Sequence, residues 1–437
     1  MILDILFGIL GLFCLVGIAF LFSENKRRIN WRLVIIGIVL QLLFAIFVIL
    51  VPGGELIFNA ISKFFVTVIN FTFDGAQFVF GILSSQEKFE KILPEDMRNM
   101  GFGFIFAFQV LPTIIFFSSL MSLLYHLGIM QRVVQAMAWI MAKAMRVSGA
   151  ESLSVAANVF IGQTEAPLVV RPYVSSMTQS ELFTLMVGGM ATIAGGVLAA
   201  YVGILGGSDP QMQVFYAKHL LSASIMAAPA TMVISKILIP ETQHSETMGK
   251  VKLKVEKTTA NVIDAAATGA SDGLRLALNV AAMLLAFIAL IAMINYILEG
   301  IGDIFEINSA IGKPLNMNLI LGYLLSPISW IIGVPWQDAI KVGSLIGQKV
   351  VINEFIAYLD LGNMIHQGLL SEKAQIISTY ALCGFANFSS IAIQIGGIGG
   401  IAPNRRADLA RLGLRAVLGG SLATFMTATI AGVLTSL

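Results

Sequence analysis

Two carboxylates, Glu165 and Glu354, lie inside stretches of sequence that are otherwise apolar. Amides and a hydroxyl accompany them, because Gln163 and Thr164 precede Glu165 and Asn353 precedes Glu354. A charged side chain at the centre of a lipid-embedded helix costs about 2.5 kcal/mol or more, so neither carboxylate is expected as mere filler. Carboxylates accept hydroxyl protons, and amides both donate and accept hydrogen bonds. We interpret the two groups as ligands of a small polar solute, with a structural hydrogen bond between helices as the alternative.

The composition sets the class of protein that must hold these side chains. Of the 437 residues, 57% are hydrophobic and only 12% are charged, which indicates that the chain lies in lipid. Apolar runs long enough to cross about 30 Å as helices recur eight times. We therefore predict an all-α polytopic membrane protein with eight transmembrane helices, at 1–22, 33–51, 102–127, 182–205, 214–239, 274–298, 375–402 and 409–437.

The loop charges predict the orientation. Lysine and arginine gather in alternate loops, at 26–32, 132–146, 250–257 and 405–411. Because such loops stay in the cytoplasm, both termini are predicted to be periplasmic in a bacterial inner membrane. The first run precedes its basic residues, as an anchor does and a cleaved signal peptide does not.

For this orientation to hold, the apolar segment 55–83 must not cross the membrane, since a further span would place every later loop on the opposite side. Lys63, Asn70 and Asp74 interrupt it. These polar residues suit a helix that lies in the headgroup plane better than one that passes through the core. We therefore predict an interfacial helix there.

Two pairs of apolar pieces are too short to cross singly. The pieces 153–161 and 166–174 flank a polar tip that contains Glu165, and 339–352 and 355–361 flank Asn353 and Glu354. Irregular backbone at membrane depth is tolerated where protein or a cavity surrounds it. We predict two re-entrant helical hairpins, hairpin 1 at about 151–178 and hairpin 2 at about 336–374.

The order of elements occurs twice. An interfacial helix (133–145 or 319–334) precedes each hairpin, and two spans follow it. The hairpins enter from opposite sides, so we expect inverted repeats. The predicted division is N-terminal scaffold helices and interfacial helix at 1–101, the first repeat at 102–240, a cytoplasmic loop at 241–273 and the second repeat at 274–437.

The span after each hairpin is broken by small and polar residues, at 191–196 and 384–390. Unwound backbone frees carbonyl groups for a cation and helix ends for a polar solute, which is typical of secondary transporters. A channel would need a continuous polar path, and a receptor or structural protein would not need matched carboxylates.

Enzyme and nucleotide motifs are missing from the sequence. It lacks H-E-x-x-H, and neither Gly249-Lys250 nor Gly312-Lys313 is followed by Ser or Thr. The net charge of +2 gives no field that would favour nucleic acid. We expect no enzymatic activity, no organic cofactor and no nucleic-acid partner.

Three motifs in order resemble the concentrative nucleoside transporter family. They are the stretch from Asn158 to Pro167, the sequence Asn353-Glu354-Phe355, and the stretch from Cys383 to Ile391. The likeness covers essentially the whole chain. It implies a homotrimer in which each protomer moves a hairpin-bearing transport domain against a scaffold in elevator-type alternating access, with a nucleoside such as uridine as substrate.

The resemblance also implies roles for individual residues. The first hairpin and the following helix would hold the nucleobase, and the second repeat would hold the ribose. The implied substrate-binding residues are Gln163, Thr164, Glu165 and Val197 for the base, and Glu354, Phe385, Asn387 and Ser390 for the sugar.

A sodium site is implied as well. Its ligands would be side-chain oxygens of Asn158 and Thr192 and backbone carbonyls of Ile161 and Ile193, and hard oxygen ligands suit such a cation. Thr164 at the first tip favours sodium coupling, because proton-coupled bacterial relatives tend to have Ser-Glu-Asn after the Gly-Gln pair. Proton coupling, or transport of another small polar solute, remains the alternative.

Overall fold

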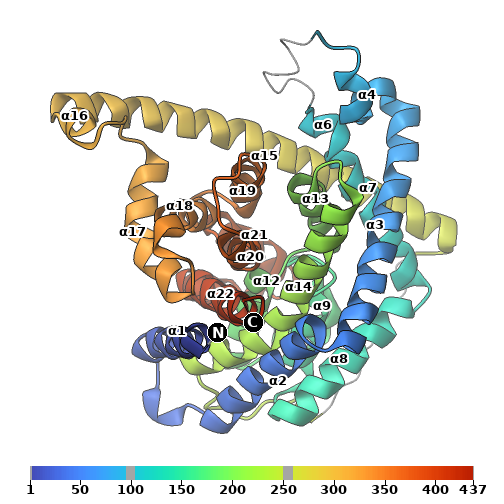
Figure 1. Cartoon of the computed structure of the whole chain (residues 1–437). Helices are drawn as coiled ribbons and strands as arrows, with labels where there is room; N and C mark the ends of the chain where they lie inside the picture. The colour runs from blue at the N-terminus through green and yellow to red at the C-terminus, as the bar shows by residue number, and fades with distance from the viewer. Residues whose placement is uncertain (1, 95–103, 250–258, 437) are drawn as a thin grey trace.

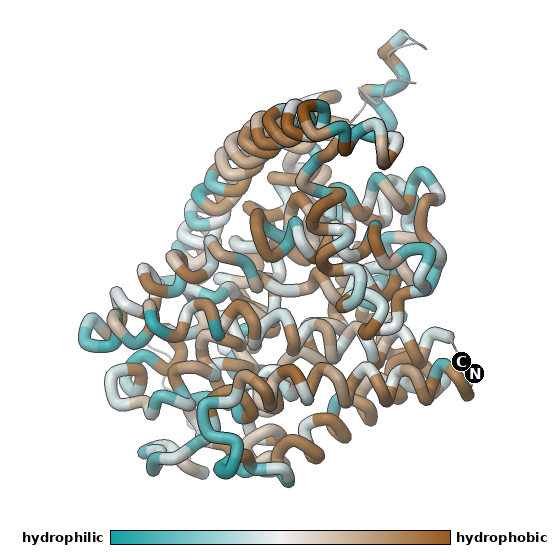
Figure 2. Tube along the Cα trace, turned by 90° about the vertical axis from the view of Figure 1, so that its left-hand side faces the viewer, coloured by the Kyte–Doolittle hydropathy of each residue, from teal (hydrophilic) through white to brown (hydrophobic). Residues whose placement is uncertain are grey.

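The computed structural model describes residues 2–94, 104–249 and 259–436. This part of the chain is helical, with one isolated β-bridge between Ser148 and Met248. Hydrophobic residues run along the helices, and hydrophilic residues gather at helix ends and in loops (Figure 2). The prediction of an all-α polytopic membrane protein is therefore confirmed.

The N-terminal helices are α1 (Ile2–Leu21), α2 (Trp31–Ile49) and α3 (Pro52–Phe80). Helix α3 buries a stripe at three- and four-residue spacing, whereas Lys63 and Asp74 lie on its exposed face. Its 29 residues are long and apolar enough to cross a membrane. Length therefore does not require the interfacial placement that we expected at 55–83.

Eight helical segments of the described chain, some of them made of helices joined end to end, could cross a membrane by length and composition, but they are not the eight expected runs. Helix α3 joins the set. The expected span at 375–402 is instead divided into α20 (Glu372–Ala381) and α21 (Phe388–Ile401), because the break between them is six residues long. The short connecting helices are α4 (Gln86–Glu90), α16 (Ile307–Ile311), η1 (Lys26–Arg28), η2 (Gly81–Ser84) and η3 (Pro403–Arg405).

Helix α15 (Val262–Ile304) is a single helix of 43 residues, which corresponds to about 65 Å. It crosses one side of the molecule as a long rod (Figure 1). It begins inside the segment 241–273 that we expected to be a loop, because the side chain of Asn261 accepts a hydrogen bond from Asp264 N at 2.9 Å and caps it. It packs along α7 (Leu111–His126), which follows the short α6 (Phe106–Gln109).

Both predicted hairpins are present as helical hairpins. Hairpin 1 consists of α9 (Gly149–Asn158) followed by the short α10 (Ala166–Val169) and α11 (Arg171–Val174), and α8 (Ile129–Met145) precedes it. Hairpin 2 consists of α18 (Trp336–Val351) and α19 (Glu354–His366). It follows α17 (Met317–Ile331), from which α18 departs at a bend of 116°.

Both predicted breaks are present. The first lies at 192–194, inside the expected 191–196, and the second lies at 382–387, a few residues earlier than the expected 384–390. Helices α12 (Gln179–Ala191) and α13 (Gly195–Gly206) follow hairpin 1, and α20 and α21 follow hairpin 2. Each pair leads into a helix of 29 residues, α14 (Pro210–Leu238) or α22 (Arg406–Leu434). Each broken span also contacts the other repeat, since α13 packs on α19 and α21 on α11. The hairpin tips and the two breaks are thereby brought to the middle of one assembly (Figure 1).

Close packing of α15 on α7 depends on Gly273, and this generates a prediction. A Cβ atom at Gly273 would lie 2.8 Å from Ile115 Cα, a backbone atom that cannot move away cheaply. We expect Gly273→Val to lower the free energy of unfolding by about 1–3 kcal/mol through overpacking. Thermal unfolding in detergent measures it. Gly300→Val on the same helix is the control, because nothing lies within 4 Å of its Cβ position; equal midpoints for the two variants would contradict the prediction.

Candidate functional site

A chain of hydrogen bonds joins the two hairpin tips. Gln163 Nε2, in the tip of hairpin 1, donates to Ser390 Oγ of α21 at 3.0 Å. Ser390 N donates to Asn387 Oδ1 at 2.8 Å, which caps α21. Asn387 Nδ2 donates in turn to Glu354 Oε2, at the start of α19, at 2.9 Å. All four residues are buried. Four of the residues that we expected to bind substrate therefore form one polar cluster.

Two further residues extend this cluster at its ends, and sequence reasoning missed both. Tyr201 OH donates to Glu354 Oε1 at 3.1 Å, so both carboxylate oxygens of Glu354 accept from neutral donors. Gln394 Nε2 donates to Gln163 Oε1 at 3.1 Å. A signal was available, because Gln394 lies four residues after Ser390, and Tyr201 four after Val197, on the same helix faces.

The other expected substrate residues lie beside this chain of hydrogen bonds and are not members of it. Thr164 Oγ1 donates to Glu165 Oε1 at 2.9 Å, and the side chain of Glu165 is exposed. Val197 is buried on α13, and Phe385 is half-buried in the break between α20 and α21. These four residues are therefore close to the cluster along the chain, but they differ from one another in burial, from the exposed Glu165 to the buried Val197.

The expected sodium ligands belong to two segments that are hydrogen-bonded to each other. Gly195 N, after the α12 break, donates to Phe160 O, next to Ile161, at 3.2 Å. Thr192, the C-cap of α12, donates from Oγ1 to Gly188 O at 2.9 Å. A Cβ atom on Gly188 would lie 3.4 Å from Asn158 Nδ2, so the end of hairpin helix α9 faces α12.

Asn158 supplies a test of whether these residues fit a cation. Its Nδ2 donates to Ser154 O at 3.0 Å, whereas its Oδ1 is buried without a hydrogen-bond partner. Among the described residues, no hydrogen bond reaches the carbonyl oxygens of Ile161 or Ile193. A buried oxygen without a partner is costly, and a hard cation accepts such oxygens as ligands. The residues present therefore fit the ion.

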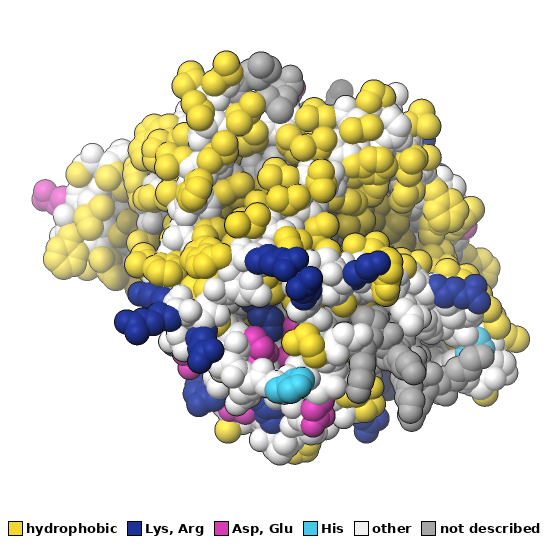
Figure 3. All heavy atoms as spheres, turned by 90° about the horizontal axis from the view of Figure 1, so that it is seen from below, with side chains coloured by type: hydrophobic (Ala, Val, Ile, Leu, Met, Phe, Trp, Pro, Cys, Tyr) yellow, Lys and Arg dark blue, Asp and Glu magenta, His cyan; other side chains and the backbone are white. Residues whose placement is uncertain are grey.

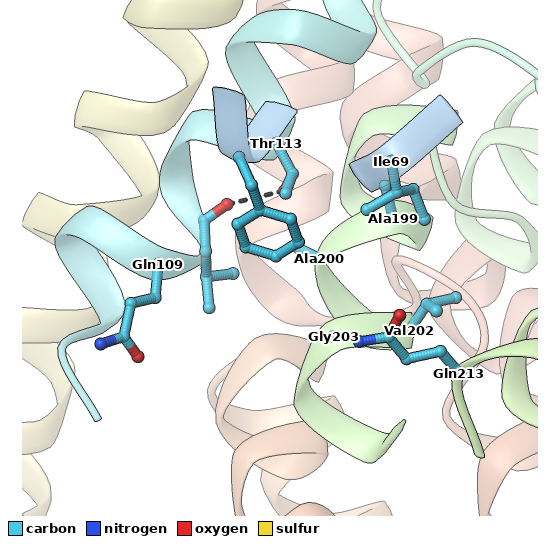
Figure 4. Close-up of a pocket in the computed structure, with 10 residues that line it drawn as sticks. Ile69, Gln109, Thr113, Ala199, Ala200, Val202, Gly203 and Gln213 are labelled. Carbon is cyan, nitrogen blue, oxygen red and sulfur yellow. Dashed lines mark hydrogen bonds between the residues drawn. The ribbon is translucent and has the colours of Figure 1, made fainter. Parts of the chain in front are cut away.

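A small cavity lies apart from this cluster (Figure 4). Residues of α3, α7, α13 and α14 line it, among them Ile69, Thr113, Ala199 and Gln213. Its volume of about 20 Å³ holds roughly one water molecule. None of the expected substrate or sodium residues lines it. The polar cluster between the hairpin tips is therefore the stronger candidate for the functional site.

Three family models match the chain. The match to "Na+ dependent nucleoside transporter N-terminus" covers residues 10–83, and the match to its C-terminus covers 219–432. The "nucleoside recognition" Gate model matches residues 107–208. Together these matches include the two hairpins, both breaks and the residues of the polar cluster.

Curated relatives and solved structures agree with the family models. The chain is 45% identical to the uncharacterized transporter YutK of Bacillus subtilis, over 99% of this chain and 100% of that protein. It is 40% identical to the nucleoside permease NupC of Helicobacter pylori, over 99% and 98%. A solved structure of CNTnw in an inward-facing substrate-bound state superposes with a TM-score of 0.89 at 44% identity, covering 99% of this chain and 98% of that one. The chain therefore belongs to the concentrative nucleoside transporter family, whose members are membrane transporters and not enzymes.

Proposed function

We propose that the chain is a secondary active symporter that imports nucleosides, uridine for example, driven by a sodium gradient. The observation that carries the proposal is the hydrogen-bonded chain from Gln163 to Glu354, which brings the two hairpin tips to one buried place. An amide at one end suits the edge of a base, and a carboxylate at the other suits a pair of sugar hydroxyls. A two-part ligand matches both ends.

In this proposal the nucleoside exchanges hydrogen bonds with the cluster. Ribose hydroxyls take the place of Asn387 Nδ2 as the donor to Glu354 Oε2, which also frees Asn387 for the sugar. The base edge replaces the contact between Gln163 and Ser390. Such an exchange keeps buried polar groups paired in both states, which limits the cost of binding. Thr164 contacts the base edge, Glu165 acts directly or through water, and Val197 and Phe385 pack on the ligand.

Sodium is the proposed coupling ion. Asn158 Oδ1, a lone pair of Thr192 Oγ1 and the carbonyls of Ile161 and Ile193 supply hard oxygen ligands. The description of the matching family as sodium-dependent supports this choice. One sodium ion that enters down 100 mV releases about 2.3 kcal/mol, and a tenfold gradient adds about 1.4 kcal/mol. Together these terms drive several-hundred-fold accumulation.

The proposed setting is a bacterial inner membrane with both termini in the periplasm. In Figure 3 the upper part of the view is largely hydrophobic, and lysine and arginine side chains gather across its middle and lower part. The positive-inside rule places such a basic band on the cytoplasmic side. The hairpins and broken spans move together against the remaining helices. We also propose a homotrimer, as the family resemblance implies.

Uptake of radiolabelled uridine into proteoliposomes tests the proposal. The vesicles receive an inward sodium gradient, an inward proton gradient or neither, and protein-free vesicles are the control. We expect accumulation with the sodium gradient alone. Accumulation with protons alone would leave a nucleoside carrier and remove the sodium site, and no accumulation by folded protein would point to another solute.

Replacing Glu354 tests the sugar end. We expect Glu354→Gln to weaken uridine binding by roughly tenfold or more, because a charged acceptor of hydroxyl protons is lost. The loss should be smaller for 3′-deoxyuridine, which lacks one of those hydroxyls. Binding to detergent-solubilised protein measures both, with the exposed Glu372→Gln as control. Equal losses for the two ligands would remove Glu354 from the sugar contact.

Replacing Asn158 tests the ion site. We expect Asn158→Ala to raise the sodium concentration for half-maximal uridine uptake several-fold, since one of the proposed oxygen ligands is lost. Uridine affinity at saturating sodium should change less. Sodium titration of uptake is the measurement, and the exposed Asn363→Ala is the matched control. A wild-type sodium response in Asn158→Ala would show that the ion binds elsewhere.

A further inference from the structure

Lys349 is a fully buried lysine in hairpin helix α18, at 0% exposure. Its Nζ donates to Ala381 O at 2.8 Å and to Thr424 Oγ1 at 2.9 Å, and it lies 5.7 Å from the centre of the Phe425 ring. Among the described residues, no carboxylate lies within 4 Å of it. A buried ammonium group without a partner anion loses several kcal/mol of hydration. Its place therefore needs a physical reason, and the substrate cluster does not use it.

Lys349 and Asn158 occupy equivalent positions in the two repeats. Each of these residues comes three positions before an isoleucine at the hairpin tip, in the sequences Asn158-Val159-Phe160-Ile161 and Lys349-Val350-Val351-Ile352. Thr192, the C-cap of α12, follows Asn158 by 34 residues. Leu382, the C-cap of α20, follows Lys349 by 33 residues. Lys349 therefore stands in the second repeat where the proposed sodium ligand Asn158 stands in the first.

The surroundings also correspond. Asn158 faces the end of α12, and Thr231 from the middle of α14 approaches the same residue, Gly188. Lys349 meets the last residue of α20, Ala381, and Thr424 from the middle of α22. In each repeat a hairpin side chain thus lies near the end of a broken helix, in a region that a threonine of the next long helix also approaches.

The atoms nearest to these two hairpin side chains differ in their hydrogen-bond partners. In the first, Asn158 Oδ1 and Thr231 Oγ1 are both buried without hydrogen-bond partners. In the second, Thr424 Oγ1 donates to Ser421 O and accepts from the Lys349 ammonium. The C-terminal end of α12 faces Asn158, and the C-terminal end of α20 faces Lys349; each end carries a partial negative charge. In the second repeat the ammonium group of Lys349 compensates the charge at the end of α20.

We propose that the ammonium group of Lys349 is a built-in cation that occupies, in the second repeat, the place corresponding to the coupling-ion site of the first. The chain then carries one exchangeable sodium ion per nucleoside. Lys349 is a positioning residue, because it ties hairpin 2 to the end of α20 permanently. Hairpin 1 has the corresponding tie only when an ion is bound. This inference rests on the proposed sodium symport.

The number of charges moved with each uridine tests the inference in the unaltered protein. Reversal potentials of radiolabelled uridine flux in proteoliposomes, at set sodium and uridine gradients, give this number. We expect one charge per uridine. Two charges would mean that a second exchangeable ion is bound, and would overturn the inference while leaving sodium symport intact. No sodium-driven flux at all would instead overturn the proposed symport, and the inference with it.

Substitution of the lysine gives a second readout. Lys349→Asn copies the first repeat, and we expect the sodium Hill coefficient to rise from about 1 toward about 2, its limit for two sites, with two charges per uridine. Lys349→Arg keeps the positive side chain, so we expect it to move one charge per uridine, as the unaltered protein does. Lys341→Met on the same helix is the control, since its side chain is 43% exposed. A folded Lys349→Asn that still moves one charge with a Hill coefficient of 1 would reduce Lys349 to a structural donor. If that variant does not fold, the wild-type charge number decides.

Discussion

Backbone groups inside a bilayer must find partners within the protein, and the breaks in the two spans after the hairpins make this demand acute. The structure meets it by joining one break to the other and to hairpin 1. Phe385 N of the second break donates to Thr192 O of the first at 3.3 Å, and Gly195 N donates to Phe160 O at the first tip. Asn387 caps α21 through its side chain. The polar site exists because helix ends that lipid would not tolerate face one another.

The same requirement explains why the site residues come from both repeats. Neither tip can satisfy its polar groups alone, since Gln163 finds Ser390 and Gln394, and Glu354 finds Asn387 and Tyr201. A site built this way pairs most of its buried polar groups across the two repeats, which suits a carrier better than an open pore.

The repeats are alike in architecture and differ in charge. Buried oxygens remain without partners beside Asn158, whereas the ammonium of Lys349 satisfies the equivalent place in the other repeat. In the proposed symport, one half of the site would take an ion from solution and the other would not. In that proposal a single ion would control one hairpin while the second keeps its packing.

Hydrophobic run length, polar tips and small-residue breaks sufficed to predict the helical membrane class, both hairpins and both breaks, because lipid penalises each exception strongly. The Asn261 cap that begins α15 is a local signal that run lengths alone do not show. Local patterns could not show that α15 packs along α7, nor that α3 is one helix with its charges on the exposed face. The approach of Tyr201 to Glu354, of Gln394 to Gln163 and of Lys349 to Ala381 joins residues far apart in the chain. Run length and residue type act locally and are readable in the sequence; which buried donor meets which acceptor is decided only by tertiary packing, since it depends on how distant helices approach.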